Sequence, residues 1–253
     1  MERGTANLDP TASPRASAAS LERLVPDELA ASDITGHRTL ELHLARYELA
    51  ARYARGRILD MACGVGYGTR LLADRGRDVV SATGVDLAGE AIAYARSRYA
   101  RDGVTYEHCD AVQFADADGF DTVVSLETIE HVPEPAVLFA RLVGLLRRRG
   151  ILIASVPTTP SVDVNPHHLH DFTERSFRAL GEQHGLREID HRRQVQPYSI
   201  VGVLSRSEQR METMRANLVR YYVNHPWAAV RRAVATARFG FSNRYLTLVW
   251  RKP

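Results

Sequence analysis

The stretch ILDMACGVGYGTRLLA, residues 58–73, passes from an apolar run, through a cluster of glycines, into a helical pattern. The short apolar run predicts a buried strand, and the spacing after the glycines predicts a helix. A glycine-rich turn between a strand and a helix suits dinucleotides, phosphates and other adenosine-bearing cofactors. The turn therefore predicts a cofactor site, and the surrounding residues have to identify the ligand.

Strands and helices alternate on the C-terminal side of this turn. Predicted strands cover residues 57–62, 79–87, 104–111, 120–128 and 151–157, with helices at 69–75, 88–100 and 135–150 between them. This alternation predicts an α/β fold with a parallel, doubly wound sheet and right-handed crossovers. A helix at 172–185 with a threonine cap and a glycine stop follows, then a strand-like segment at 186–196 and a strand at 243–253 that would close the sheet.

The remaining segments flank this core. Residues 1–20 are rich in Ala, Ser, Thr and Pro and predict a disordered tail. Residues 21–55 predict an N-terminal helical segment that lies against the domain, in which Leu40, Leu44, Tyr47 and Ala51 share one face of a helix. The core is expected to cover 56–204, followed by a mostly helical insertion at 205–243 and the last strand of the core at 244–253.

Composition argues against several classes of protein. No apolar run approaches the roughly 20 residues that span a bilayer, and the N-terminal residues lack the apolar centre of a signal peptide, so we expect no membrane partner and a cytoplasmic location. Two cysteines, Cys63 and Cys109, argue against a disulfide framework or a cysteine-ligated zinc site. A net charge of +3 with scattered arginines predicts no nucleic-acid partner. The expected partner is a small molecule, and a homodimer is the default oligomer.

Acidic residues stand at the ends of the first three predicted strands: Asp60, Asp86 and Asp110. Asp60 would repel a pyrophosphate but suits an amino group or a cation, and the turn has the spacing GxGxG rather than the GxGxxG of dinucleotide sites. Asp86, 22 residues after Gly64, is placed to bind both hydroxyls of a ribose. Asp110 is placed to meet the amino edge of an adenine. A ligand with a cationic end, a ribose and an adenine, but no pyrophosphate, is S-adenosylmethionine.

From about residue 43 to residue 173 the chain resembles a class I S-adenosylmethionine-dependent methyltransferase of the type 11, or UbiE-like, small-molecule group. ILDMACGVGYGTRLLA is similar to the first motif of this family, VTGVDLAGEAIAYAR to its second, and FDTVVSLETIEHVPEP to its fourth-strand motif. HLARYELAA and NPHHLHDFTERSF resemble a subset associated with sugar, glycan and natural-product tailoring. The resemblance implies a Rossmann-like, seven-stranded sheet whose last strand is antiparallel, with residues 21–55 as an N-terminal helical lid that covers the substrate together with the C-terminal insertion.

The resemblance also implies roles for individual residues. Val65 departs from the subset, which often carries an acidic residue there. Cys63 is interpreted as a small buried residue of a tight turn, because methyl transfer from a sulfonium needs no covalent enzyme intermediate. The implied cofactor-binding residues are Asp60, Cys63, Gly64 and Gly66 at the methionine end, Asp86 and Leu87 at the ribose, Asp110 and Ala111 at the adenine, Leu126 and Glu127 from the fourth strand, and Arg46 and Tyr47 reaching the cofactor carboxylate from the lid.

Transfer to a hydroxyl needs a base near the acceptor, and histidine suits this role near neutral pH. His168 is the first candidate, because it aligns with the histidine of the NPxH pattern of the subset, and His131 is the second. A divalent ion held by His167, His168, His170 and Asp171 is an alternative, but the adjacent His167 and His168 point apart in an extended loop, so no metal site is assigned.

The leading function is an O-methyltransferase acting on a sugar or another secondary-metabolite scaffold. An N-methyltransferase acting on an amino sugar or similar amine is its rival, since a neutral amine needs little help from a base. A nicotinamide oxidoreductase is disfavoured by the missing third glycine and by Asp60. A nucleic-acid methyltransferase is disfavoured because SLETIE stands where Asn/Asp-Pro-Pro-Tyr would be expected. A cofactor-binding protein without catalysis would not explain the histidine-rich loop.

Overall fold

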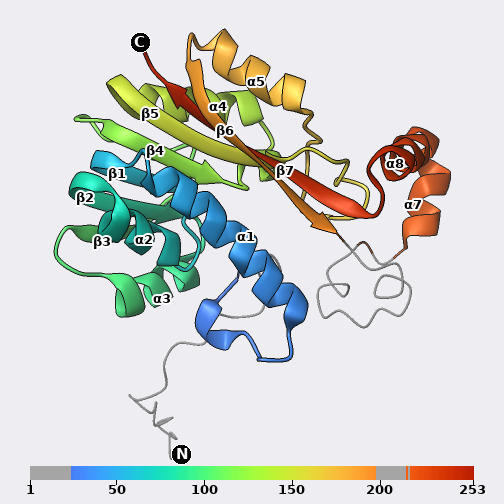
Figure 1. Cartoon of the computed structure of the whole chain (residues 1–253), viewed down its shortest axis with the longest axis horizontal. Coiled ribbons are helices and arrows are strands. Elements are labelled where there is room, and N and C mark those ends of the chain that lie inside the picture. Colours follow the sequence, from blue (N-terminus) through green and yellow to red (C-terminus); the bar gives the residue numbers. More distant parts are fainter. Residues whose placement is uncertain (1–23, 198–214, 216) are drawn as a thin grey trace, which may run out of the picture.

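A computed structural model describes residues 24–197, 215 and 217–253. The fold is built on a seven-stranded sheet in the order β3-β2-β1-β4-β5-β7-β6 (Figure 1). The first five strands pair in parallel, whereas β7 is antiparallel to both β5 and β6, which confirms the predicted Rossmann-like topology. The strands are β1 (Arg55–Met61), β2 (Arg77–Asp86), β3 (Val104–His108), β4 (Phe120–Leu126), β5 (Leu146–Pro157), β6 (Arg187–Pro197) and β7 (Ser242–Arg251).

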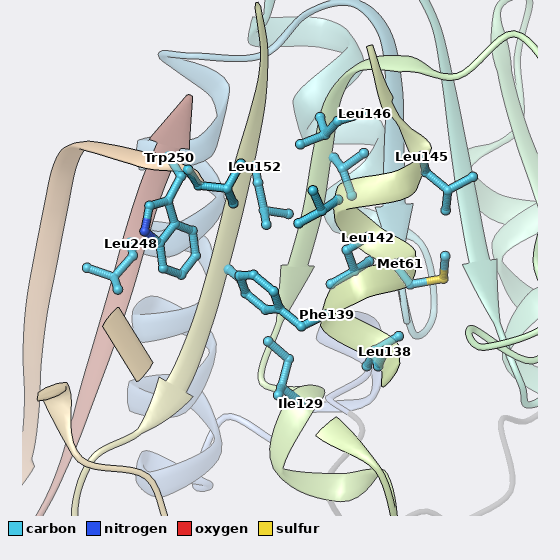
Figure 2. Packing of buried hydrophobic residues seen from close by; sticks show 14 of the residues in the cluster. Met61, Ile129, Leu138, Phe139, Leu142, Leu145, Leu146, Leu152, Leu248 and Trp250 are labelled. Atoms are coloured by element: carbon cyan, nitrogen blue, oxygen red, sulfur yellow. The ribbon is translucent and has the colours of Figure 1, made fainter. Parts of the chain in front are cut away.

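Helices cover both faces of the sheet, because each crossover between parallel strands returns over one face. The helices are α1 (Ile34–Ala51), α2 (Tyr67–Arg75), α3 (Gly89–Tyr99), α4 (Pro135–Leu145), α5 (Glu174–Gln183), α7 (Leu218–Asn224) and α8 (Pro226–Phe239), with the short turns η1 (Pro26–Glu28) and η2 (Ile129–His131). One buried cluster joins α1, α2 and α3 to the sheet, and the other joins α4 and α5 to the opposite face. Figure 2 shows part of the second cluster, in which Phe139 packs edge-on against Trp250 with 5.5 Å between ring centroids.

The fourth helix ends earlier than the sequence pattern predicts. The expected helix over 135–150 ends at Leu145, and β5 begins at Leu146. Leu146 is buried and pairs with Phe120 of β4, so strand pairing overrides the helical pattern there. Lys252 Nζ donates hydrogen bonds to the carbonyl oxygens of Val143 and Leu146, which fixes the change of direction.

The lid helix α1 is tied to the far edge of the sheet. Gln194 Nε2 donates to the carbonyl oxygen of Leu42, and Gln196 Nε2 donates to Oγ1 of Thr39 over 3.0 Å. Both glutamine side chains are buried on β6, so they hold α1 beside the sheet edge. The tail over 1–20 and the first part of the predicted insertion lie outside the described residues. Among the residues that are described, no helix is both long and apolar enough to cross a membrane.

Candidate active site

A cavity of about 790 Å³ opens at the carboxyl ends of the parallel strands, where open α/β sheets bind their ligands. Its wall combines the loop after β1, the ends of β2 and β4, the lid helix α1, the loop before α5, and α8 with β7. The predicted site residues that line it are Tyr47, Cys63, Gly64, Asp86, Leu87, Asp110, Ala111, Leu126, Glu127, His131 and His168. The sheet therefore brings most of the predicted residues to one place.

Asp86 fixes the glycine-rich loop to the end of β2. Its Oδ2 accepts a hydrogen bond from the backbone N–H of Gly64 over 2.9 Å, and its Oδ1 accepts one from the N–H of Ala88 over 2.9 Å. The side chain is only 7% exposed, yet it lies on the cavity wall. A carboxylate held this way has further lone pairs for hydroxyl donors, so its position fits a ribose.

Asp60 is completely buried and does not line the cavity. Its Oδ2 accepts hydrogen bonds from Oγ1 of Thr69 over 2.7 Å and from the hydroxyl of Tyr47 over 3.2 Å. Burial raises the pKa of Asp60 to about 7, although these two hydrogen bonds act in the opposite direction. Tyr47, whose hydroxyl contacts Asp60, does line the cavity. Asp60 therefore supports a residue of the cavity wall without lining the cavity itself.

Gly66 shapes the loop rather than the cavity wall. Its φ of +90° lies in the left-handed region, and a Cβ there would be 2.6 Å from Cβ of Ala95. The hydroxyl of Tyr106 donates to the carbonyl oxygen of Gly66 over 2.9 Å, and α2 begins at the next residue. Only glycine fits this conformation and this space.

Arg46 is buried beside the cavity without lining it. Its guanidinium carbon lies 4.4 Å from the centre of the Tyr245 ring, and its Nε is 3.9 Å from Oε1 of Glu127. Among the described residues, Nε and one terminal nitrogen have no hydrogen-bond partner. An unsatisfied buried guanidinium is costly, so this position fits a ligand that carries a carboxylate. The resemblance implied such a role for Arg46 toward the cofactor carboxylate, and that role stays a prediction.

Two residues of the cavity wall hold a left-handed backbone conformation without being glycine. Glu127 has a φ of +52° and Ala62 a φ of +62°. The hydroxyl of Ser155 donates to Oε1 of Glu127 over 2.6 Å, and the N–H of Glu127 contacts the same Ser155. Such strain persists only where the surroundings enforce it, and it is common at ligand-binding sites.

The two cysteines are free and both line the cavity. Cys63 is buried, and burial raises the pKa of its thiol well above the usual value. A thiol held in its neutral form is a poor nucleophile. This agrees with the interpretation of Cys63 as a packing residue of the turn.

His131 and His168 meet on the cavity wall although they are far apart in the sequence. Their rings pack edge to face with 4.6 Å between centroids. Nδ1 of His131 lies 3.1 Å from the carbonyl oxygen of His167, and Nδ1 of His168 lies 2.7 Å from Oγ of Ser161. A carbonyl oxygen only accepts, so Nδ1 of a neutral His131 carries the proton and Nε2 carries the lone pair.

The other residues of the predicted histidine cluster have different positions. The side chain of His170 contacts the carbonyl oxygen of Pro133 over 3.1 Å and joins the two loops. Asp171 accepts the N–H groups of Ser161 and Val162. Ligand atoms of Glu130, His131 and His168 lie within 4.8 Å of one another, so this set, rather than His167 and His170, has the spacing of a metal site.

Sequence reasoning missed a polar part of the cavity wall that lies beside the lid. The hydroxyl of Tyr245 donates to Oε1 of Gln196 over 2.9 Å, and Gln196 in turn reaches Thr39. The available signal was alternation: Gln194 and Gln196 are polar residues that face inward on a strand. The missed residues of this part are Thr35, Thr39, His43, Gln196, Asn243 and Tyr245.

The chain is similar to methyltransferases in sequence and fold. Residues 59–154 match the family described as "Methyltransferase domain". A "Probable S-adenosylmethionine-dependent methyltransferase" of Mycobacterium tuberculosis is 31% identical over 176 residues, which cover 67% of this chain and 61% of that relative. A "Ubiquinone biosynthesis O-methyltransferase" of Aromatoleum aromaticum is 36% identical over 118 residues, covering 45% of this chain and 49% of that protein. The crystal structure of the N-methyltransferase NodS from Bradyrhizobium japonicum, in complex with S-adenosylhomocysteine, superposes with a TM-score of 0.55 and 15% identity, covering 88% of this chain and 90% of that one.

The sheet order, the cavity at the strand ends and the sequence match define a class I S-adenosylmethionine-dependent methyltransferase domain. Within that class the chain belongs to the UbiE-like group, and its cofactor is S-adenosylmethionine, as the motifs predicted. The chain spans 61% of the length of the mycobacterial relative, so the reaction of the whole protein is a separate question.

Proposed function

We propose that the protein transfers a methyl group from S-adenosylmethionine to a hydroxyl of a small polar acceptor, a sugar or another secondary-metabolite scaffold. The observation that carries the proposal is the pair His131 and His168 on the cavity wall, with 4.6 Å between ring centroids. The polar part of the wall around Thr39, Gln196 and Asn243 supports a hydroxylated acceptor, since hydroxyl and amide groups bind hydroxyl groups.

Methyl transfer requires the protein mainly to position the acceptor and the methyl group. Bound S-adenosylmethionine supplies an activated methyl group on a sulfonium. The cavity walls must hold the acceptor in line with this methyl and exclude water. An acceptor hydroxyl must also lose its proton near the transition state, and a base within hydrogen-bond reach contributes about 10²–10⁴-fold.

The histidine pair can supply that base. Nε2 of His131 is the lone-pair nitrogen, and Oε1 of the buried Glu130 lies 3.9 Å from it. A carboxylate there favours the imidazolium that forms when the ring accepts a proton. His168, the first candidate from the sequence, packs against this ring and is oriented by Ser161. We assign the base to this pair.

N-methylation of an amino sugar or another small amine is the second candidate. The N-methyltransferase NodS has a similar fold at 15% identity, and that likeness shows the fold alone. An amine that enters the site neutral needs no base. The two candidate functions therefore differ in how strongly turnover should depend on His131 and His168.

The test measures methyl transfer to panels of hydroxylated sugars and amino sugars by mass spectrometry. His131→Ala and His168→Ala are compared with the wild type, and His167→Ala is the control because the His167 side chain is exposed outside the cavity wall. We expect at least one cavity variant to lose about 10²–10⁴-fold in kcat with unchanged cofactor affinity, and the control to keep its activity. Full turnover in both cavity variants would exclude base-assisted transfer and favour amine chemistry.

A further inference from the structure

The two C-terminal helices α7 and α8 expose apolar side chains to solvent. Figure 1 shows both helices together at one end of the molecule, beside the start of β7. Val219 and Val223 on α7 are 76% and 75% exposed, and Trp227 on α8 is 78% exposed. Val230 and Val234, also on α8, are 48% and 60% exposed. Large apolar side chains this exposed mark a surface that contacts something else.

Three of these side chains lie on one side of α8. Trp227, Val230 and Val234 are separated by three and four residues, which places them on the same side of a helix. The opposite side faces the protein, where Ala228 is buried and Arg232 binds Asp163. Helix α8 is therefore amphipathic, with its apolar side turned outward. We call the set Trp227, Val230 and Val234 the outer apolar face.

The segment that carries the outer apolar face is basic. Residues 215–241 contain five arginines and neither aspartate nor glutamate. Arg232 and Arg231 pair with Asp163 and Asp171. Within the described part of the chain, no carboxylate lies within ion-pair distance of Arg220 or Arg238, so these two charges are available to an anionic partner.

We propose that the outer apolar face docks on an anionic lipid bilayer. Amphipathic helices with tryptophan and aliphatic residues on one side and arginines at its border lie in the interface of such membranes. Arginines near an anionic surface strengthen the binding of such helices electrostatically. A second copy of the chain is the less fitting occupant, because a twofold contact through α7 and α8 would bring two arginine-rich surfaces together.

The inner side of the same helices lines the candidate active site. Leu218, Ala235 and Thr236 belong to the cavity wall. Docking through the outer apolar face would therefore hold the cavity next to the lipid surface. This proposal concerns contact with one leaflet, so it replaces the expectation that the protein has no membrane partner without requiring a spanning segment.

The test is flotation of the full chain with two kinds of vesicle, one of phosphatidylcholine alone and one with phosphatidylglycerol added at three parts in ten. Wild-type protein should float with the anionic vesicles and bind the neutral ones about tenfold less, with binding weakened by high salt. Tryptophan emission gives a second readout. The chain has two tryptophans, and Trp250 is buried, so a blue shift on adding vesicles reports Trp227.

Two variants and a matched control complete the experiment. Trp227→Ser combined with Val230→Ser should reduce binding to anionic vesicles at least tenfold, as should Arg220→Gln combined with Arg238→Gln. Val80→Ser removes an equally exposed valine from β2 and should change nothing. Absence of binding, or equal binding by all variants, would overturn the proposal. So would a dimer, detected by light scattering, that Trp227→Ser dissociates in protein that does not bind vesicles.

Discussion

The hydroxyl of Tyr47 lies 3.2 Å from Oδ2 of Asp60, and both side chains are removed from solvent. The lid helix thus contacts the first strand through a neutral hydroxyl and an acid, with no cation of the described residues paired to that acid. Burial raises the pKa of Asp60 to about 7, and burial also raises the pKa of Tyr47. The pair therefore makes the stability of the ligand-free protein depend on pH.

Asp60→Asn should stabilise the ligand-free protein at high pH. The unfolded chain releases the Asp60 proton near its ordinary value of 3.8, whereas the folded protein keeps it until about 7. The neutral Asp60 side chain contributes its full stabilisation below pH 3.8, and this contribution to the free energy of unfolding declines as the pH rises from 3.8 to about 7. An asparagine stays neutral, so the variant should gain about 3 kcal/mol relative to the wild type between about pH 5 and about pH 8.

Urea unfolding at the two pH values measures this difference. Asp78→Asn is the control, because Asp78 is exposed on the surface, and its difference from the wild type should stay constant. A constant difference for Asp60→Asn as well would mean that Asp60 is ionised in the folded protein.

Gly68→Ala should weaken cofactor binding. A Cβ at position 68 would stand inside the ring of Tyr47, so the ring would have to move. Tyr47 lines the cavity and bonds to Asp60, and we expect its displacement to raise the Kd for S-adenosylmethionine about tenfold, the equivalent of about 1.4 kcal/mol. Calorimetric titration checks this.

Gly144→Ala is the matched control for that substitution. Gly144 also lies within a helix, but a Cβ there meets nothing within 4 Å. It should leave the affinity unchanged and stabilise the protein by about 0.5–1 kcal/mol. Unchanged affinity in Gly68→Ala would show that Tyr47 does not position the cofactor.

The alternation of strands and helices was sufficient to predict the sheet and the strand ends at which Asp86 and Asp110 stand, because local periodicity encodes them. The end of α4 was missed, since the pairing of Leu146 with Phe120 is a long-range contact. His131 and His168 are 37 residues apart and yet their rings meet. The only indication of this in the sequence was that each histidine comes after a predicted strand. No local sequence pattern indicated that Asp60 would contact Tyr47 instead of lining the cavity, because that contact depends on how α1 packs against the sheet.

Asp86→Ala should remove most of the affinity for S-adenosylmethionine. The change removes the acceptor placed for the ribose and releases the N–H groups of Gly64 and Ala88, so the glycine-rich loop loses its anchor. Hydrogen bonds to a charged group contribute about 1.5–3 kcal/mol each, so a loss of at least tenfold is expected. Calorimetric titration with S-adenosylmethionine, S-adenosylhomocysteine and NAD checks it. Binding of NAD by the wild type, or full affinity in the variant, would contradict the assignment of the strand-end carboxylates.

Removal of divalent metal should leave turnover unchanged. The cluster Glu130, His131 and His168 has the spacing of a metal site, but the same geometry provides a base with a nearby carboxylate. A base mechanism predicts equal rates before and after dialysis against EDTA, with a bell-shaped or rising pH profile. Activity lost with EDTA and restored by magnesium, manganese or zinc would instead assign the cluster to a metal ion.

Asp163→Asn should loosen α7 and α8 while leaving the sheet intact. Asp163 is 4% exposed and accepts hydrogen bonds from Nε of Arg232 over 2.8 Å and from the hydroxyl of Tyr222 over 2.7 Å. Burial alone would raise the pKa of Asp163, but these hydrogen bonds hold it below its usual range, so the ion pair is charged near neutral pH. It joins the loop after β5 to both helices. Loss of the charge on Asp163 should lower the local stability of α7 and α8 by about 2 kcal/mol.

Hydrogen exchange measured by mass spectrometry shows which segments lose stability in Asp163→Asn. Exchange in 218–239 should accelerate by roughly thirtyfold, which corresponds to about 2 kcal/mol of local stability, and exchange in β1 and β4 should not change. Arg231→Gln is the control, because the side chain of Arg231, which pairs with Asp171, is 59% exposed and the pair should contribute about 0–1 kcal/mol. Arg232 lines the cavity, so the KM for the acceptor should rise in Asp163→Asn while the Kd for the cofactor stays constant. Equal acceleration across the whole chain would mean that Asp163 stabilises the domain globally and that α7 and α8 do not open as a unit.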